Sequence, residues 1–283
     1  MGKKQRTVLI ALLAMALGSL VWLALGQPRE PIYKGKLLSA WLDEYNHAAL
    51  PITRDPAKTA ILQIGTNGVP VLLRLASTKD SVLWEKLRML VARQKLIPFH
   101  LRTAGEYRDM ALVGFEILGP AAKPAVPGLI GLLKDQNWSV RGTAMYALGR
   151  IGPEAAAAVP ALIEAGGNTN IYTETWMVTM TLTNIHREPS LVVPFFMEQL
   201  RKIPPPGPKS TEELAMWRTG PAPRWFLAVD TSIVGLGRLG SQARTAVPAL
   251  LPLLTYEDYR IRTLVTNTLE KIDPEAAAKA GIP

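Results

Sequence analysis

The chain has 283 residues, of which 48% are hydrophobic, so it can bury a sizeable core and is not disordered as a whole. It contains no cysteine, which excludes disulfides, thiol nucleophiles, cysteine-ligated zinc, attachment of c-type haem and a lipoprotein anchor. Its net charge of +9 favours acidic partners, anionic surfaces or nucleic acid.

The first element in chain order is an uncharged apolar run that follows the basic hexapeptide MGKKQR. Residues 7–26 read TVLIALLAMALGSLVWLALG, and a helix of this length, at about 1.5 Å per residue, spans the roughly 30 Å hydrocarbon core of a bilayer. The preceding cations predict that residues 1–6 are a cytoplasmic tail and that the rest lies on the extracytoplasmic side. We expect a single-pass signal anchor; the alternative is a signal peptide cleaved near Gly26 and an exported protein.

Residues 27–55 are expected to form a linker and one short amphipathic helix. In GKLLSAWLDEYNHAAL (35–50), one helical face carries Leu37, Leu38, Trp41, Leu42 and Tyr45. This helix is predicted to cap the open end of a helical stack, which otherwise exposes an apolar stripe. The alternative is a helix that binds a partner.

Residues 56–283 repeat one pattern of 33–34 residues, with two intervals longer by about 21 residues. The pattern of each unit predicts a first helix with one apolar stripe, which ends at a glycine in the left-handed conformation. A Val-Pro step then begins a second helix, and a polar turn follows it. The turns KDQNWSVR and TYEDYRIR both end in a β-branched residue followed by Arg. In both, an aromatic residue lies three positions before that Arg. Because neither helix can bury its stripe alone, we expect the units to stack over one core. The units are in register at Gly65, Gly119, Gly152, His186, Gly240 and Asp273.

The third unit, DQNWSVRGTAMYALGRIGPEAAAAVPALI, resembles the HEAT repeat in its short bacterial, phycobilisome-lyase-like form. The matching residues are Asp135, Val140, Arg141, Ala144, Leu148, Gly149, Ile151, Gly152, Pro153, Ala158, Val159, Pro160 and Leu162. The resemblance implies an all-α fold, a right-handed, armadillo-like α-α superhelical solenoid of HEAT-like helical hairpins. The apolar run at 7–26 predicts one transmembrane helix before this solenoid. It implies no particular chemistry, because function depends on surface residues that such folds vary freely.

The first insertion, near 79–109, carries five Lys/Arg and no acid between Lys86 and Arg102. This pattern predicts a basic patch for phosphate head groups or an acidic partner. The alternative is the solvated face of a helix whose Leu87, Leu90 and Val91 point inward. The candidate binding residues of this segment are Arg88, Arg93, Lys95 and Arg102.

The second insertion, near 201–225, holds six prolines and two tryptophans. Loops on a rigid scaffold commonly carry binding residues, and Trp and Arg are typical anchors of interfaces. We therefore name Trp217, Arg218 and Trp225 as candidate partner-binding residues. The alternative is that both tryptophans fold back onto the solenoid.

No catalytic, cofactor-binding or metal site is expected. The three histidines, His47, His100 and His186, are scattered and form no H-x-x-x-H motif, and the sequence holds neither G-x-S-x-G nor a phosphate loop. The acidic pairs are adjacent in sequence and so point in different directions on a helix.

These patterns predict a non-enzymatic, membrane-tethered scaffold or adaptor of a bacterial envelope that binds another protein outside the cytosol. One alternative is an enzyme or enzyme subunit of the lyase-like HEAT class. A second alternative is a basic solenoid that binds nucleic acid, which requires a Lys/Arg stripe along successive second helices. Helices such as VPALIEA and VPALLPLL lack that stripe, so nucleic acid is not expected as the partner.

Overall fold

A computed structural model describes residues 30–48, 51–93, 101–167, 172–203 and 224–282. This part of the chain is helical apart from one two-stranded antiparallel hairpin. The elements, with η for a 3-10 helix, are β1 (Ile32–Tyr33), β2 (Lys36–Leu37), α2 (Leu38–His47), α3 (Pro51–Ile64), η1 (Gly65–Gly68), α4 (Val69–Ala76), α5 (Val82–Arg93), α6 (Ala104–Leu118), η2 (Gly119–Ala125), α7 (Val126–Leu132), α8 (Trp138–Ile151), η3 (Gly152–Ala158), α9 (Val159–Gly167), α10 (Tyr172–Ile185), α11 (Pro189–Leu200), α13 (Arg224–Leu239), η4 (Gly240–Ala246), α14 (Val247–Leu250), η5 (Leu251–Thr255), α15 (Tyr259–Ile272) and α16 (Pro274–Lys279).

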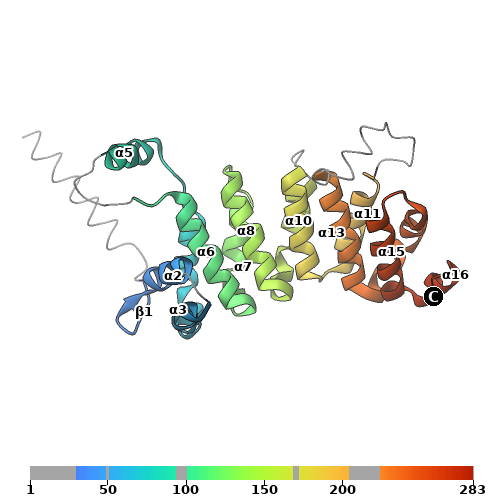
Figure 1. Cartoon of the computed structure of the whole chain (residues 1–283), viewed down its shortest axis with the longest axis horizontal. Helices are drawn as coiled ribbons and strands as arrows, with labels where there is room; N and C mark the ends of the chain where they lie inside the picture. Colours follow the sequence, from blue (N-terminus) through green and yellow to red (C-terminus); the bar gives the residue numbers. More distant parts are fainter. Residues whose placement is uncertain (1–29, 49–50, 94–100, 168–171, 204–223, 283) are drawn as a thin grey trace, which may run out of the picture.

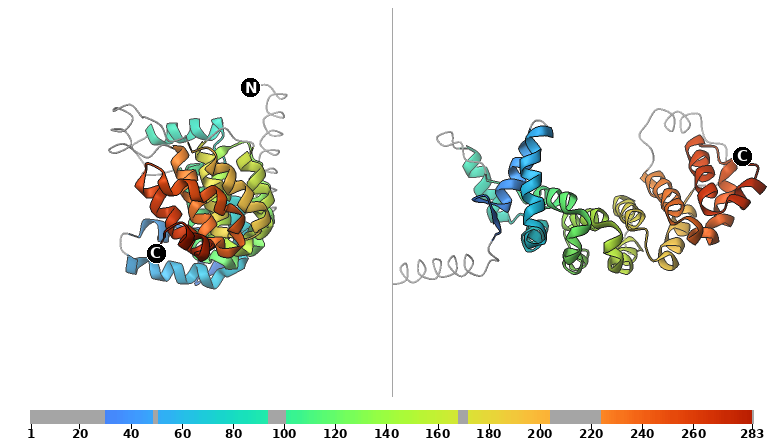
Figure 2. Two further views of the ribbon diagram at one scale, coloured as in Figure 1. Left: turned by 90° about the vertical axis from the view of Figure 1, so that its right-hand side faces the viewer. Right: turned by 90° about the horizontal axis from the view of Figure 1, so that it is seen from below.

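Helical hairpins follow one another along a single axis (Figure 1). The first helices of successive units, α6, α8, α10, α13 and α15, pack each against the next. Seen from below, the stack curves, so that its two ends lie on the same side of its middle (Figure 2, right). The predicted all-α solenoid is confirmed.

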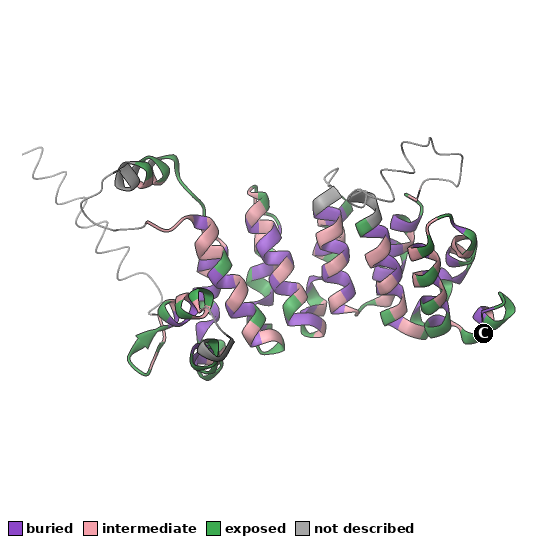
Figure 3. Ribbon diagram, in the orientation of Figure 1, coloured by how far each residue is buried: buried purple, intermediate pink, exposed green. Residues whose placement is uncertain are grey.

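One hydrophobic cluster runs through the whole stack, from Leu38 to Ile282. Buried residues occur in every unit (Figure 3). In α8 the predicted stripe is fully covered, at Val140, Ala144, Ala147, Leu148 and Ile151. The core is therefore shared between neighbouring units, as expected for helices that bury their stripes only by stacking.

Five of the six turn residues have a positive φ: Gly65, Gly119, Gly152, His186 and Gly240. At Gly119 and Gly152 the conformation nevertheless differs from the predicted left-handed helix cap. Gly119 has φ 51° and ψ −129°, and Gly152 has φ 68° and ψ −136°. These angles match the first central residue of a type II′ turn, which starts the following 3-10 helix. His186 also has a positive φ, of 38°, whereas Asp273 has φ −153° because its side chain caps α16 by accepting from the Ala276 amide.

The N-terminal end is covered by α2, which packs on α3 and α6. Leu38, Trp41 and Leu42 are buried there, and the Trp41 indole Nε1 donates to the Tyr33 carbonyl at 3.1 Å. Leu37 is 43% exposed, contrary to the predicted face, because it belongs to β2 and precedes the helix.

No helix in the described ranges is long and apolar enough to cross a membrane. The predicted signal anchor, residues 7–26, and the basic tail before it lie outside the described residues.

Candidate partner-binding edge

In the described parts of the chain, the second helix of one unit ends and the first helix of the next begins on one side of the stack, uppermost in Figure 1, which we call the inter-repeat edge. The first insertion lies between α4 and α6. The second leaves the described fold at residue 203, after α11, and returns at residue 224, where α13 begins. The opposite side carries the short 3-10 turns η1 to η4. In repeat proteins, insertions gathered on one face often mark the binding face.

A repeated arginine builds the turns of this edge. Arg108, Arg141 and Arg262 each lie eleven residues before the turn residue of their unit. The Arg141 Nη1 donates to the carbonyls of residues 135 and 136 at 2.7 and 3.0 Å, and the Arg262 Nη1 donates to those of residues 256 and 257 at 2.6 and 2.8 Å. Arg108 donates to the carbonyl of residue 78 at 2.6 Å. These bonds satisfy carbonyls of the turns, which lie beyond the ends of α4, α7 and η5.

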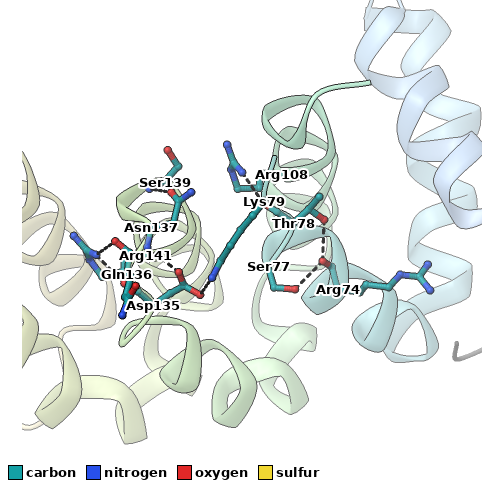
Figure 4. Close-up of polar contacts among 10 residues, drawn as sticks. All are labelled: Arg74, Ser77, Thr78, Lys79, Arg108, Asp135, Gln136, Asn137, Ser139 and Arg141. Carbon is teal, nitrogen blue, oxygen red and sulfur yellow. Dashed lines mark hydrogen bonds and ion pairs between the residues drawn. The ribbon is translucent and has the colours of Figure 1, made fainter. Parts of the chain in front are cut away.

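The first two turns of the edge are joined by an ion pair. Lys79 Nζ lies 2.7 Å from a carboxylate oxygen of Asp135, which is 15% exposed (Figure 4). The hydrogen bond from Lys79, with that from the Asn137 amide, lowers the pKa of Asp135 below its usual value. One unit further on, Arg141 pairs with Glu174, and the two side chains are 20% and 11% exposed. The turns are thus braced from unit to unit.

An exposed aromatic residue follows the capping residue of two of these turns. The side chain of Asn137 accepts from the amide two residues on, and so does that of Asp258, each capping its helix. Trp138 comes next after the first cap and is 62% exposed; Tyr259 follows the second and is 68% exposed. The units that end at His186 and Gly240 also have an aromatic residue at this position, Tyr172 and Phe226, whereas the units that end at Gly65 and Gly119 have Pro51 and Gly105. The sequence signal for these residues is the aromatic three positions before the repeated arginine, which by itself indicates only a turn.

The second cap lies in a charged cluster at the far end of the edge. Burial raises the pKa of Asp230, and the positive charge of Arg260 partly offsets this. Burial acts in the same direction on Asp258, but the hydrogen bonds from Arg260 outweigh it and lower the pKa of Asp258. The guanidinium lies 2.8 Å from the carboxylate of Asp258. This cluster holds its charges in local pairs and does not converge on a common point.

The structure places two of the seven predicted binding residues in full. Arg88 lies in α5 and pairs with Glu85 at 2.8 Å. Arg102 pairs with Asp43 of α2 at 2.6 Å, so this cation anchors the root of the first insertion. Arg93 ends α5 and Trp225 lies in α13, with side chains outside the description. The remaining three lie outside the described residues: Lys95, Trp217 and Arg218.

The described side chains of the inter-repeat edge combine exposed aromatics with paired charges. In the described ranges, no group of three or more His, Asp or Glu could hold a metal ion, and every buried side-chain nitrogen or oxygen has a hydrogen-bond partner. The inter-repeat edge presents the exposed side chains of Trp138 and Tyr259 on turns that ion pairs hold in place.

Fold and edge together define the class as an α-helical repeat protein, a solenoid of stacked helical hairpins. Residues 125–155 match the family model of the HEAT repeat, which confirms the resemblance for this segment. None of the curated proteins matches the chain.

Several solved structures are similar in outline. An engineered protein is 17% identical, with 84% of this chain and 96% of that chain covered and a TM-score of 0.43. A designed armadillo repeat protein in complex with the peptide (KR)4 is 13% identical, with 83% and 99% covered and a TM-score of 0.47. The karyopherin Kap121p bound to the SUMO protease Ulp1p is 13% identical, with 86% and 32% covered and a TM-score of 0.35.

Proposed function

We propose that this protein is a scaffold or adaptor that binds another protein through its inter-repeat edge. The observation that carries the proposal is the pair of exposed aromatics, Trp138 and Tyr259, at the same position of their units on the edge from which both insertions leave the described fold. Tryptophan and tyrosine are enriched at protein interfaces, where a large side chain with two χ angles gains much contact area for little lost entropy. The proposal assigns no catalysis to the chain.

The charges of the edge favour a protein partner over nucleic acid. Lys79, Arg141 and Arg260 are each paired with a carboxylate of this chain. Binding to nucleic acid gains most of its affinity from cations that neutralise phosphates, and these cations already have anionic partners. The exposed aromatic side chains of Trp138 and Tyr259 add apolar contact surface, which a protein partner can cover.

We further propose that residues 7–26 tether the solenoid to a membrane, with the solenoid outside the cytosol. The support is the uncharged apolar run after Lys3, Lys4 and Arg6. Carbonate extraction of membranes and protease digestion of intact cells test this directly. Release of the chain from membranes by carbonate contradicts the tether. A solenoid that protease cannot digest from outside the cytoplasmic membrane contradicts the proposed orientation.

The binding edge is tested by affinity purification of the tagged full-length chain from gently solubilised membranes, with quantitative mass spectrometry. We expect a partner recovered with the wild type to be lost when Trp138→Ala and Tyr259→Ala are combined. Leu191→Ala is the matched control, because Leu191 is 43% exposed but begins α11 on the opposite side of the stack.

Equal recovery with the double variant and the wild type contradicts the proposed edge. Loss of the partner with Leu191→Ala alone assigns the contact to the opposite side. Circular dichroism of each variant shows whether the solenoid is intact, which we expect because all three side chains are exposed.

A further inference from the structure

Helix α5 lies near the N-terminal end of the stack and stands apart from the stacked helices (Figure 1). It takes no part in the main packing pairs of the described helices. The roots of the insertion that carries it are nevertheless fixed. The Trp84 indole Nε1 donates to the Arg102 carbonyl at 3.1 Å, and the Ala104 amide donates to Asp80 Oδ1 at 2.9 Å. The helix is thus held at a defined place while one of its faces stays uncovered.

The uncovered face of α5 combines apolar and cationic side chains. Val82 is 76% exposed and Met89 is 48% exposed, and Lys86 between them is also exposed. Their spacing of four and three residues places them on one helical face, and Arg93 occupies the next position of this stripe. Glu85, the one acid of α5, lies 2.8 Å from Arg88. The face therefore has the composition of a helix that lies on an anionic interface.

Positive charge is concentrated at this end of the molecule. Residues 30–110 contain 12 Lys/Arg and 8 Asp/Glu, whereas residues 111–283 contain 16 and 15. The body of the solenoid beyond the first insertion is thus close to neutral. An anionic surface is attracted to the N-terminal end and not to the rest.

The sequence places the same end close to the predicted membrane span. The apolar run ends at Gly26, and the described fold begins at Glu30, where the neighbouring Pro31 carbonyl already accepts from the Leu38 amide at 3.0 Å. Residues 27–29 extend about 10 Å at most, at roughly 3.5 Å each. A span at 7–26 therefore holds the end that carries α5 next to the lipid head groups.

We propose that the uncovered face of α5 binds an anionic lipid surface, a second membrane contact that orients the solenoid. This inference rests on the membrane tether of the proposed function. Lys86 interacts with lipid phosphates, and Val82 and Met89 enter the boundary between head groups and acyl chains. Two contacts at one end leave the inter-repeat edge from Trp138 onward available to the partner.

The absence of cysteine makes the test direct, because Met89→Cys provides a single labelling site. The full-length chain is labelled there with a bimane fluorophore and reconstituted in nanodiscs of phosphatidylcholine, alone or mixed with phosphatidylglycerol. Lipids with nitroxide head groups then report proximity by quenching. We expect stronger quenching in the anionic nanodiscs, which Lys86→Glu combined with Arg93→Glu reduces to the level of the neutral ones.

Two controls isolate the effect. Reversal of two exposed cations elsewhere, Lys134→Glu with Lys271→Glu, gives the same change of charge and is expected to leave the quenching unchanged. A label at Leu251→Cys, near the far end of the stack, is expected to remain unquenched in both lipid mixtures.

Equal quenching in neutral and anionic nanodiscs, or full quenching in the reversed variant, overturns the inference. A chain that inserts into nanodiscs but is not quenched contradicts the α5 contact alone. A chain that does not insert contradicts the tether, and the α5 inference then fails with it. If the reversed variant keeps its quenching but loses the protein partner, α5 is a protein contact and the lipid assignment is wrong.

Discussion

Arg141 shows how one side chain of the repeat joins three parts of the structure. It donates to two carbonyls of the preceding turn and pairs with Glu174 of the next unit. The Glu174 side chain is only 11% exposed, so little water reaches its carboxylate. The Arg141 guanidinium replaces that water as the partner of the negative charge. Arg141 therefore acts as a brace between units, and its contacts are with groups of this chain.

Replacing this brace tests its contribution. Arg141→Met is expected to lower the free energy of unfolding by about 2–3 kcal/mol, because two carbonyls and a mostly buried carboxylate lose their partner. Arg262→Met, which removes two similar carbonyl bonds, is expected to cost about 1 kcal/mol. Urea unfolding followed by circular dichroism measures both. Equal losses would show that the Glu174 pair adds nothing.

Gly235 marks a close approach between neighbouring helices. A Cβ atom there would lie 2.5 Å from the Phe196 ring and 2.6 Å from the Thr183 hydroxyl. Gly235→Ala is therefore expected to destabilise the fold by about 1–3 kcal/mol through overpacking. Gly131→Ala, a helical position with no neighbour within 4 Å of the added atom, is expected to stabilise by up to about 1 kcal/mol. Thermal unfolding of both variants measures these changes in stability. An unchanged melting temperature for Gly235→Ala contradicts the packing argument.

At the scale of elements, the inter-repeat turns combine helix caps with ion pairs, and this makes one of them sensitive to acid. Asp135 accepts hydrogen bonds from Lys79 and from the Asn137 amide, which lower its pKa. A carboxyl whose pKa is lower in the folded state stabilises the fold above its ordinary value of 3.8, and this contribution is lost as the pH falls through the folded-state pKa.

The prediction concerns the acid side of the stability profile. Asp135→Asn is expected to lower stability at neutral pH and to flatten the loss of stability below about pH 4, since the titrating group is gone. Glu275→Gln, at an exposed position of α16, is the matched control for the removal of one carboxylate. Urea unfolding across the pH range measures both. An Asp135→Asn profile parallel to that of the wild type contradicts the assignment.

At the scale of the whole molecule, stability is distributed through contacts between neighbours. The central helix α8 packs against α6 on one side and α10 on the other, whereas α15 packs against α13 and the short C-terminal elements. We expect hydrogen exchange to be slower for amides of α8 than for those of α15, because end units lack one neighbour. Mass spectrometry of exchanged peptides measures this. Equal protection along the stack would indicate one fully cooperative unit.

The sequence by itself determined the repeat, the order of the helices and the buried stripe, as in α8, because these follow from spacing and turn chemistry within about 34 residues. It did not reveal the type II′ angles at Gly119 and Gly152, nor the exposure of Leu37, because local geometry depends on what the next element requires. Only the tertiary structure placed helix α5 and the aromatics Trp138 and Tyr259 on one edge. The physical reason is that the stacking of units, through contacts such as Arg141 with Glu174, sets which distant residues share a surface.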